Sequence, residues 1–380
     1  MILFILMVFT VYGGVHVFAF LRARSVFAFG PAVGIAIAAF MLLMVFAIFL
    51  IRTFEQYEYE AFARLLSYIA YFWMAALFLF FSGSLVLDLV SLVTRTSGWI
   101  TRSDVSVFLL SSRTSFFICL GLALSISVYG YFEAEDIRME RVRIETTKLP
   151  VGTDRLTITQ ISDVHLGLII RNKRLEKMLD VVRAAKPDIF ISTGDLVDAQ
   201  INHLTGLAEL LRGIKTKYGN YAITGNHEYY AGLDKALVFT REAGFTVLRN
   251  EAKAVGPIII AGVDDRTAIQ MKLEKPVSEK ELLVKLTRDR FILFLKHQPR
   301  IDRSTIGLFD LQISGHTHSG QIFPFTLLTR IIFPMNAGSF DLGNGSLLYV
   351  NRGTGTWGPP IRFLAPPEVT VYELVRKTGP

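Results

Sequence analysis

The stretch "RLTITQISDVHLG" at residues 155–167 decides how the second half of this chain folds. Its first eight residues are rich in β-branched side chains, a composition typical of a strand. Asp163 and His165, two polar side chains one residue apart, follow this strand at once. In an extended segment residues i and i+2 face the same side, so these two side chains are expected to point into one space. Taken alone, the pair fits a turn as well as it fits a binding site.

The same alternation of strand and polar turn is repeated downstream. Strands that end in polar residues alternate with segments of helical spacing, which predicts an α/β fold with covered sheets. Later strands follow one another with few helices between them, which predicts a second sheet packed on the first. The predicted helices occupy 171–186, 205–219 and 231–243. The predicted strands after the first occupy 187–195, 220–228, 245–250, 257–264, 290–297, 309–316, 345–353 and 368–375.

The first third of the chain has a different composition. The whole sequence is 51% hydrophobic and only 19% charged, and the apolar excess lies before about residue 133. Each apolar stretch there is close to the ~20 residues that cross a bilayer as a helix. Few ionisable side chains, among them His16 and Asp88, lie within them, which favours an anchor over a transporter. The four predicted spans occupy 2–20, 28–51, 67–87 and 114–132.

These patterns predict an integral, multi-pass membrane protein with a membrane domain over 1–135, a linker or short strand over 136–152 and a soluble domain over 153–380. The first span lacks a basic leading region and a cleavage pattern, so we expect it to be retained. Arginines in the first and third loops place the soluble domain outside the cell, whereas the arginines at 138–143 favour the opposite side. We expect the external side.

Composition also limits the possible partners. The single cysteine, Cys119, excludes an intrachain disulfide and thiolate metal sites. The net charge of +7 beside a membrane favours anionic ligands or anionic membrane lipid, although a solvated basic surface explains it equally well. No long basic run is interleaved with aromatic residues, so we expect no nucleic-acid partner, and no obligate protein partner is evident.

Polar residues gather at the carboxyl ends of the predicted strands, where α/β folds place their ligand sites. Turn preferences could explain any one cluster, but five of the seven histidines lie in these clusters. Carboxylates, imidazoles and one amide oxygen suit Mn, Fe, Zn or Co. The set is too large for one ion with an open position and suits two. Its members are Asp163, His165, Asp195, Asn226, His227, His297, His316 and His318.

The order of these clusters resembles the signature of the calcineurin-like metallophosphoesterase family. The five blocks are "DVHLG" (163–167), "GD" (194–195), "GNHE" (225–228), "KH" (296–297) and "GHTH" (315–318). The resemblance covers about residues 150–380 and implies a four-layer αββα sandwich that hydrolyses phosphoric ester bonds. The late segments "GVDD" (262–265) and "NRGTGTWGPPIRF" (351–363) are similar to the YkuE-like, membrane-associated branch.

The resemblance also implies a role for each site residue. His227 would be a catalytic histidine near the leaving group, and Glu228 would orient it. The cofactors would be two divalent ions, with manganese expected and Fe, Zn or Co as alternatives. One ion would be held by Asp163, His165, Asp195 and His318, and the other by Asp195, Asn226, His297 and His316.

The substrate is less well defined by the sequence. Arg171, Arg174 and Arg352 are candidate substrate-binding residues, although the first two also fit a solvated helix start. The apolar segment 321–336 could contact the membrane and admit a lipid tail, or pack under the second sheet. We expect hydrolysis of a phosphate ester or diester on a phosphorylated, lipid-linked or membrane-proximal substrate. The alternatives are a pyrophosphatase of a nucleotide-diphospho-lipid, similar to UDP-diacylglucosamine hydrolases, and a non-catalytic membrane scaffold.

Overall fold

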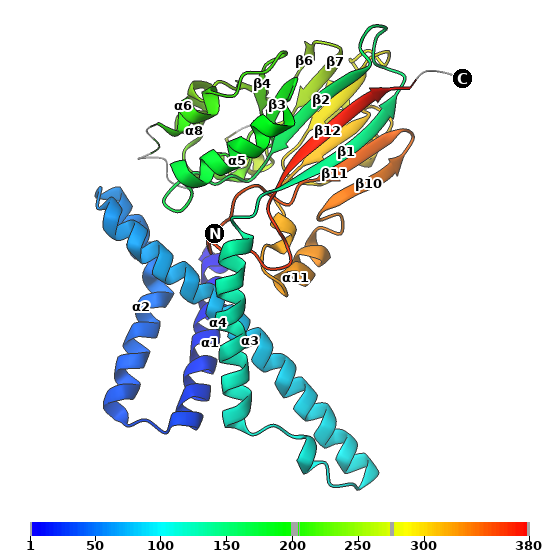
Figure 1. The fold of residues 1–380 in the computed structure, drawn as a ribbon. Helices are drawn as coiled ribbons and strands as arrows, with labels where there is room; N and C mark the ends of the chain where they lie inside the picture. Colours follow the sequence, from blue (N-terminus) through cyan, green and yellow to red (C-terminus); the bar gives the residue numbers. More distant parts are fainter. Residues whose placement is uncertain (1, 199–203, 205, 274–276, 378–380) are drawn as a thin grey trace. The chain divides into compact units, whose positions relative to one another are not determined.

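The computed structural model describes residues 2–198, 204, 206–273 and 277–377, with side chains from residue 9 onward. The chain divides into two compact units (Figure 1). The first, here the helical unit, comprises residues 1–132 and 358–361. The second, here called the catalytic domain after the function expected from its sequence, comprises residues 133–357 and 362–380.

Long helices make up the helical unit. Three segments of the described residues are long and apolar enough to cross a membrane: Pro31–Gln56, Glu60–Thr101 and Ser106–Glu133. Among the described residues, three candidate spans are therefore found where four are expected. The predicted span at 2–20 lies in a helix that is not among the three, and the side chains of residues 2–8 lie outside the described part of the chain. The helices are α1 (Ile2–Phe27), α2 (Pro31–Gln56), α3 (Glu60–Thr101) and α4 (Ser112–Glu133).

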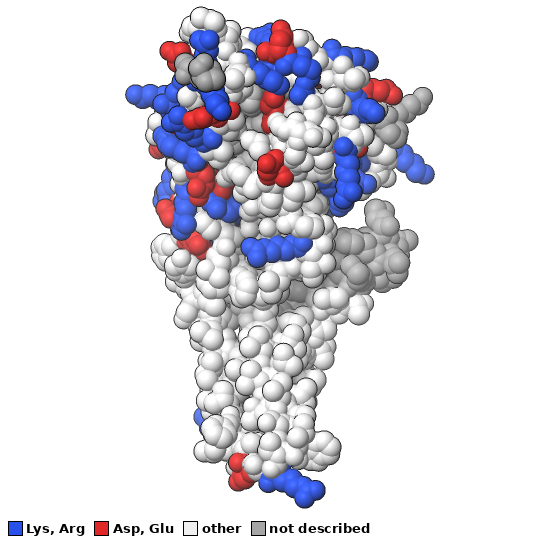
Figure 2. Space-filling model, turned by 90° about the vertical axis from the view of Figure 1, so that its right-hand side faces the viewer, with Lys and Arg blue, Asp and Glu red and all other residues white. Residues whose placement is uncertain are grey.

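Polar side chains within the helical unit pair with one another. Arg22 of α1 forms an ion pair with Asp88 of α3, and the Trp73 indole donates a hydrogen bond of 2.9 Å to His16 Nε2. Both polar groups noted in the predicted spans therefore join helices, as expected for an anchor. Figure 2 shows that charged side chains gather on the catalytic domain and are sparse on the visible face of the helical unit. The external position of the catalytic domain remains a prediction.

The catalytic domain contains two six-stranded sheets. In the first sheet β2, β3, β4 and β5 run parallel, and in the second sheet β7, β8, β9 and β11 run parallel. The first sheet, in spatial order, contains β1 (Arg138–Thr146), β12 (Glu368–Arg376), β2 (Arg155–Ile161), β3 (Ile189–Ser192), β4 (Asn220–Ala222) and β5 (Thr246–Val247). The second contains β10 (Gly338–Gly343), β11 (Ser346–Val350), β9 (Leu311–Ser314), β8 (Phe291–Leu295), β7 (Ile258–Gly262) and β6 (Glu251–Val255).

Alternation along each strand explains how the layers stack. Ile189 and Ile191 of β3 belong to the apolar core between the sheets, together with Leu293 of β8. Phe190, between them in sequence, faces the helices on the other side of the first sheet. Side chains of two successive residues point to opposite faces, so strands buried on both faces are apolar throughout. The expected sandwich of two covered sheets is present.

Helices cover the two sheets unequally. Three helices pack on the outer face of the first sheet, whereas the outer face of the second is covered by loops and by the short α10, which contributes Leu283. The layer order therefore agrees with the expected αββα arrangement, with a thin fourth layer. The helices on the first sheet are α5 (Asn172–Ala185), α6 (Leu207–Arg212) and α8 (Leu233–Glu242). The remaining helices are α7 (Asn226–Tyr230), α9 (Thr267–Gln270), α10 (Glu279–Leu283) and α11 (Phe325–Ile332).

The predicted strands are all present, mostly shorter than expected, because their polar ends form turns. The segment 136–152, expected to be a linker or short strand, contains β1, whose nine residues pair in parallel with β12. Two further strands, β6 and β10, are not predicted from the sequence. Both are edge strands whose side chains are largely exposed, so they lack the apolar run that identifies the inner strands.

Removing a side chain from the core between the sheets should destabilise the catalytic domain. Leu293 is fully buried and lies opposite Ile260 and Leu311 on the neighbouring strands. Leu293→Ala is expected to lower the free energy of unfolding by about 2–5 kcal/mol, through lost burial and the cavity that remains. Thermal and urea unfolding of the detergent-solubilised protein measures this. Val238→Ala, on the exposed face of α8, is the control and should change little; equal effects would contradict the two-sheet core.

Candidate metal centre

The five polar clusters meet at one edge of the domain. β2, β3 and β4 are parallel neighbours in the first sheet, and β8 and β9 are parallel neighbours in the second. Their carboxyl ends therefore lie together, and each strand is followed by one cluster. Two groups of side chains with metal-ligand spacing form there.

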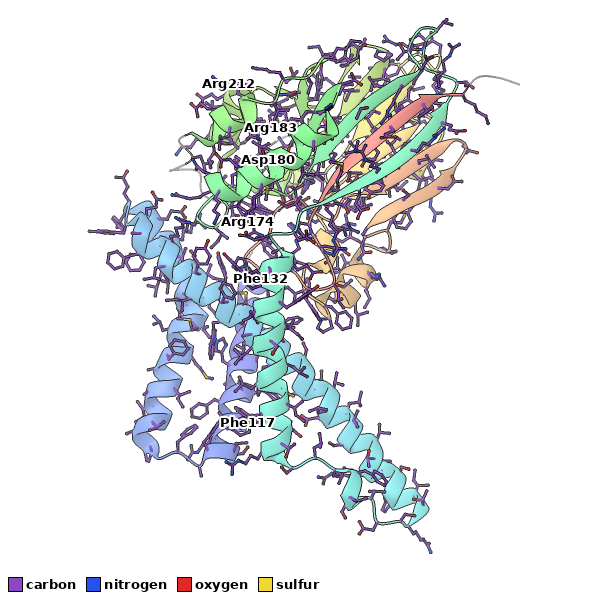
Figure 3. The ribbon with its side chains drawn as sticks, in the orientation of Figure 1. Phe117, Phe132, Arg174, Asp180, Arg183 and Arg212 are labelled. Atoms are coloured by element: carbon purple, nitrogen blue, oxygen red, sulfur yellow. The ribbon has the colours of Figure 1, made fainter. Side chains whose placement is uncertain are left out.

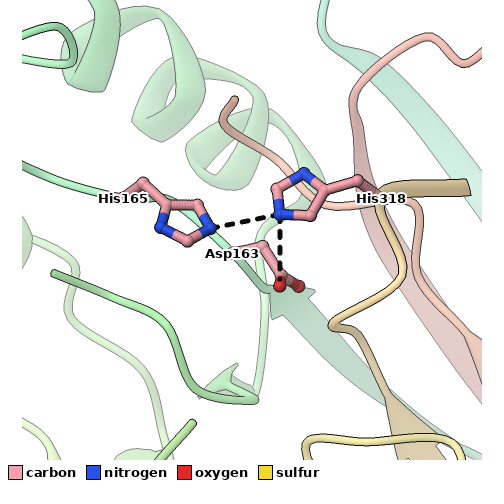
Figure 4. Close-up of side chains that lie close together, drawn as sticks. All are labelled: Asp163, His165 and His318. Carbon is pink, nitrogen blue, oxygen red and sulfur yellow. Dashed lines mark hydrogen bonds and ion pairs between the residues drawn. The ribbon is translucent and has the colours of Figure 1, made fainter. Parts of the chain in front are cut away.

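The first group consists of Asp163, His165 and His318, all buried (Figure 4). His165 Nε2 lies 3.1 Å from His318 Nε2, and His318 Nε2 lies 3.5 Å from Asp163 Oδ1. Three ligand atoms within 4.8 Å of one another can hold a single ion. Burial lowers the pKa of His165 to about 3, so its imidazole is neutral and its lone pair is available to a metal.

The second group consists of Asp195, His297 and His316. His297 Nε2 lies 3.3 Å from Asp195 Oδ2, 3.2 Å from His316 Nδ1 and 3.2 Å from Asn226 Oδ1. The same carboxylate oxygen of Asp195 lies 3.9 Å from His165 Nε2 of the first group. Asp195 Oδ2 thus lies beside a member of each group, and His316 and His318, two residues apart, belong to different groups.

The donor set of the second group fits a cation. His297 Nδ1 lies 2.8 Å from the Thr193 carbonyl oxygen, which can only accept, so Nδ1 carries a hydrogen. In the neutral ring, Nε2 then presents a lone pair toward a carboxylate oxygen, an amide oxygen and another imidazole. Such converging lone pairs repel unless a positive charge lies among them. Burial disfavours the imidazolium, yet the Asp195 carboxylate raises the pKa of His297 well above its usual value, so a proton can play this part without a metal.

The backbone at these residues differs from the extended geometry expected for D-x-H and H-x-H. Positive φ values, uncommon outside glycine, occur at five of the seven predicted ligands. Such strain persists only where the surrounding structure enforces it and is concentrated at functional sites. The paired side chains therefore converge through left-handed turns and not through a strand-like alternation. The five φ values are 54° at Asp163, 54° at His165, 51° at Asp195, 71° at His316 and 47° at His318.

Two motif glycines lie at positions where no side chain fits. A Cβ at Gly315 would lie 2.2 Å from Asp163 Oδ2, and a Cβ at Gly225 would lie 2.2 Å from Asp195 Oδ1. Neither distance is sterically possible, so only glycine lets these loops approach the two carboxylates. Gly315 of "GHTH" thus lets a loop of the second sheet approach the Asp163 loop of the first. Gly225 of "GNHE" lets two neighbouring loops of the first sheet approach each other.

The expected role of Glu228 is corrected by its hydrogen bonds. Its carboxylate accepts backbone N–H groups from Gly225 (2.6 Å), Asp195 (3.0 Å) and Leu196 (2.8 Å). Glu228 is the third residue of α7 and reaches back to the residue before the helix, as in a capping box. It therefore ties the "GD" loop to the "GNHE" loop. Burial raises the pKa of Glu228 to about 7.

Asp198, which the sequence patterns do not single out, is the carboxylate beside His227. Its Oδ1 lies 3.0 Å from His227 Nδ1, and the His227 backbone N–H donates to Asp195 Oδ1 at 2.8 Å. Burial opposes protonation of His227, but Asp195 and Asp198 raise its pKa to about 9. The only sequence signal is an acidic residue three positions after Asp195. His227 is also close enough to His165 and Asp195 to form a third possible ligand group.

Arg362 is a second residue that the sequence patterns do not identify. Its guanidinium is fully buried and donates to the carbonyl oxygens of Gly353, Gly355 and Ala365. Its Nη2 lies 3.1 Å from His318 Nδ1. Burial, and next the Arg362 charge, hold the pKa of His318 well below its usual value, so His318 stays neutral. Its position in "NRGTGTWGPPIRF" is the only sequence signal.

The three arginines expected to bind substrate have other contacts. Arg174, near the start of α5 (Figure 3), is buried and donates to the Ala134 carbonyl oxygen at 2.7 Å. Arg352 forms ion pairs with Glu140 (2.6 Å) and Glu368 (2.7 Å). Arg171 Nε donates to the Gly167 carbonyl oxygen at 3.3 Å. The role of the three arginines in substrate binding stays a prediction.

The chain is similar to known metallophosphoesterases. The family model described as calcineurin-like phosphoesterase matches residues 156–320. A metallophosphoesterase of Aquifex aeolicus is 40% identical over 259 residues, 67% of this chain and 98% of that protein. The metallophosphoesterase YkuE of Bacillus subtilis is 34% identical over 65% of this chain and 89% of its own.

A third relative bears on the membrane region. The transmembrane protein with metallophosphoesterase domain of Danio rerio is 31% identical over 67% of this chain and 61% of its own length. Its name agrees with the three apolar helices, and the chain is an integral membrane protein. The resemblance inferred from the five blocks is confirmed, because the Aquifex relative is matched over nearly its whole length. The chain belongs to the calcineurin-like metallophosphoesterases, metal-dependent hydrolases that act on phosphoester bonds.

Proposed function

We propose that this chain hydrolyses a phosphate ester or diester at a two-metal centre, on a lipid-linked or membrane-proximal substrate. The observation that supports the proposal is the position of Asp195 Oδ2, which lies 3.3 Å from His297 Nε2 of the second group and 3.9 Å from His165 Nε2 of the first. Manganese is the proposed metal, with Fe, Zn or Co as alternatives. The residues that would hold the two ions are Asp163, His165, Asp195, Asn226, His297, His316 and His318.

Two bound ions would hold phosphate oxygens and lower the pKa of a water molecule. The protein's own residues supply the rest. His297 is kept in one orientation by the Thr193 carbonyl, and His318 is kept neutral beside Arg362. His227, held at Nδ1 by Asp198, would use Nε2 to deliver a proton to the leaving oxygen. Glu228 would position the two loops that carry Asp195 and His227.

The proposed substrate class rests on the chain's membrane helices. Only four residues, 134–137, separate the end of α4 from the first strand of the catalytic domain. At most ~3.6 Å per residue, this segment keeps the first strand within about 15 Å of the helix end. A substrate carried by the bilayer is therefore always within reach. A manganese-supplemented screen against lipid phosphates and nucleotide-diphospho-lipids tests this, since the products are inorganic phosphate and a nucleoside monophosphate respectively.

Removing the shared charge should abolish activity without unfolding the protein. Asp195→Asn keeps an oxygen that can accept the His227 N–H but removes the charge common to both groups. Hydrolysis of an aryl phosphodiester is expected to fall to background, with metal content reduced in elemental analysis and the melting temperature retained. Asp180→Asn, on the exposed face of α5, is the control. Full activity in Asp195→Asn protein would refute the proposed centre.

His227 should matter for turnover and not for metal content. General acids contribute about 10²- to 10⁴-fold, so His227→Ala is expected to lower kcat by that factor while both metals stay bound. Steady-state kinetics and elemental analysis on the same preparation measure the two effects. A leaving group of low pKa should restore much of the rate, because it needs no proton. If metal is lost in step with activity, His227 is a ligand instead.

Arg362 should act through metal affinity. Lysine cannot reproduce the planar set of donors that binds the carbonyl oxygens around His318. Groups that orient a metal ligand typically affect affinity by about 10- to 100-fold, and we expect a loss of this size in Arg362→Lys. Isothermal titration calorimetry with Mn²⁺ measures this loss of affinity. Arg183→Lys, an exposed arginine of α5 (Figure 3), is the control and should bind Mn²⁺ normally.

A further inference from the structure

The helix α11 has its apolar side turned outward. Its two buried side chains are Thr326 and Thr329, whereas Leu327 and Leu328 are 54% and 47% exposed, and Ile331 is 77% exposed. A helix on the surface of a water-soluble protein has the opposite arrangement. An apolar environment outside the domain would remove this mismatch.

The exposed side chains form one surface. We define the α11 surface as six large apolar residues, all at least 39% exposed, in an interval of ten. The only charged residue within α11 is Arg330. Soluble proteins seldom expose contiguous apolar patches of this kind unless the patch contacts a protein or a membrane. The members are Phe323, Phe325, Leu327, Leu328, Ile331 and Ile332.

The position of α11 is fixed by the loop that carries the candidate metal centre. A Cβ on Gly320 would lie 2.4 Å from Thr326 Cα, so the helix packs directly on the residues after His318. The Gln321 amide donates to the Trp357 carbonyl oxygen and accepts the Trp357 N–H, both at 2.9 Å. The α11 surface is thus part of a packed structure, and the exposure of its side chains follows from the fold.

A groove beside α11 combines apolar and basic residues. It has a volume of about 400 Å³ and is lined in part by Ile332, Phe333 and Met335 from the α11 side and by Arg300 and Arg303 from the opposite side. The Phe333 ring lies 5.2 Å from the His316 ring, and the Arg300 guanidinium lies 4.9 Å above the Phe333 ring. Arginines next to an exposed apolar surface match the phosphate groups and acyl chains of a phospholipid.

The chain brings its own bilayer to this surface. The last candidate membrane helix ends at Glu133, whose carboxylate accepts the Leu364 N–H at 3.2 Å. Arg174 binds the next residue, Ala134, through its carbonyl oxygen. Residues 133 and 134, which follow directly on the membrane helix, are thus part of the packed catalytic domain. An apolar surface on a domain tethered in this way has a membrane interface permanently within reach.

We propose that the α11 surface inserts into the head-group and upper acyl region of the bilayer that the membrane helices cross, with Arg300 and Arg303 at lipid phosphates. The occupant is the phospholipid bilayer itself. The insertion places the groove, and through Phe333 the His316 side of the candidate centre, against lipid. This docking requires neither bound metal nor turnover.

Lipid contact at α11 can be measured with a single fluorophore in the full chain. Cys119→Ala removes the native thiol, and Leu328→Cys provides one site for a nitrobenzoxadiazole label. The protein is reconstituted into phosphatidylcholine–phosphatidylglycerol vesicles with or without doxyl-labelled lipid. The matched control is Val151→Cys, 85% exposed and separated from the membrane exit by the ~30 Å length of β1. We expect doxyl quenching several-fold stronger at Leu328 than at Val151, and iodide quenching in the reverse order.

Each other outcome overturns the proposal. If iodide quenches the Leu328 label as strongly as the Val151 label and doxyl lipid does not, the surface remains in water. If neither quenches it, a second copy of the chain covers the surface, since no other protein is present. The same labels in an Asp195→Asn background separate the two proposals: lipid quenching should persist there although hydrolysis is lost.

Discussion

The buried carboxylate of Asp195, in contact with the His297 imidazole, is the charge around which the rest of the catalytic domain is arranged. An isolated charge at this depth would cost far more than a small domain can supply, so every neighbouring group must compensate it. His297 lies 3.3 Å from one oxygen, and the His227 N–H binds the other. Glu228, itself buried, organises the N–H groups that surround this loop. Two sheets that end at the same edge are the simplest way to bring such groups from distant parts of a chain.

Compensation of that charge also explains the backbone. Loops that follow five strands of the two sheets meet around two carboxylates, and only glycine is small enough at Gly225 and Gly315. The left-handed turns at Asp163 and His318 then direct side chains inward from loops that have little room to move. Backbone strain of this kind persists because the strands behind the loops are buried on both faces and hold the loops in place. The packed core therefore holds the loops of the candidate metal centre in their strained conformation.

Sequence patterns predict this architecture well where a residue's role is local. A strand followed by Asp, Asn or His identifies the edge, and the spacing of five motif blocks identifies the family. They fail where a role depends on tertiary contacts. Asp198 and Arg362 carry no pattern of their own, and only the folded chain brings Asp198 to His227 and wraps carbonyl groups around Arg362. Glu228 adjoins His227 in sequence, yet the start of α7 turns its carboxylate toward backbone groups. Arg352 forms ion pairs with Glu140 and Glu368, which are distant from it in sequence, so no local pattern predicts these contacts.

The pairing of β1 with β12 has a practical consequence for the boundaries of this protein. Four residues separate β1 from α4, and β1 runs beside β12 over nine residue pairs. A soluble fragment cut at residue 153 would leave β12 as an open edge, with a row of unpaired N–H and carbonyl groups and an apolar inner face. Edges of that kind template aggregation. The smallest fragment suited to solution studies therefore starts before Arg138, and its first strand is also the segment that leaves the membrane.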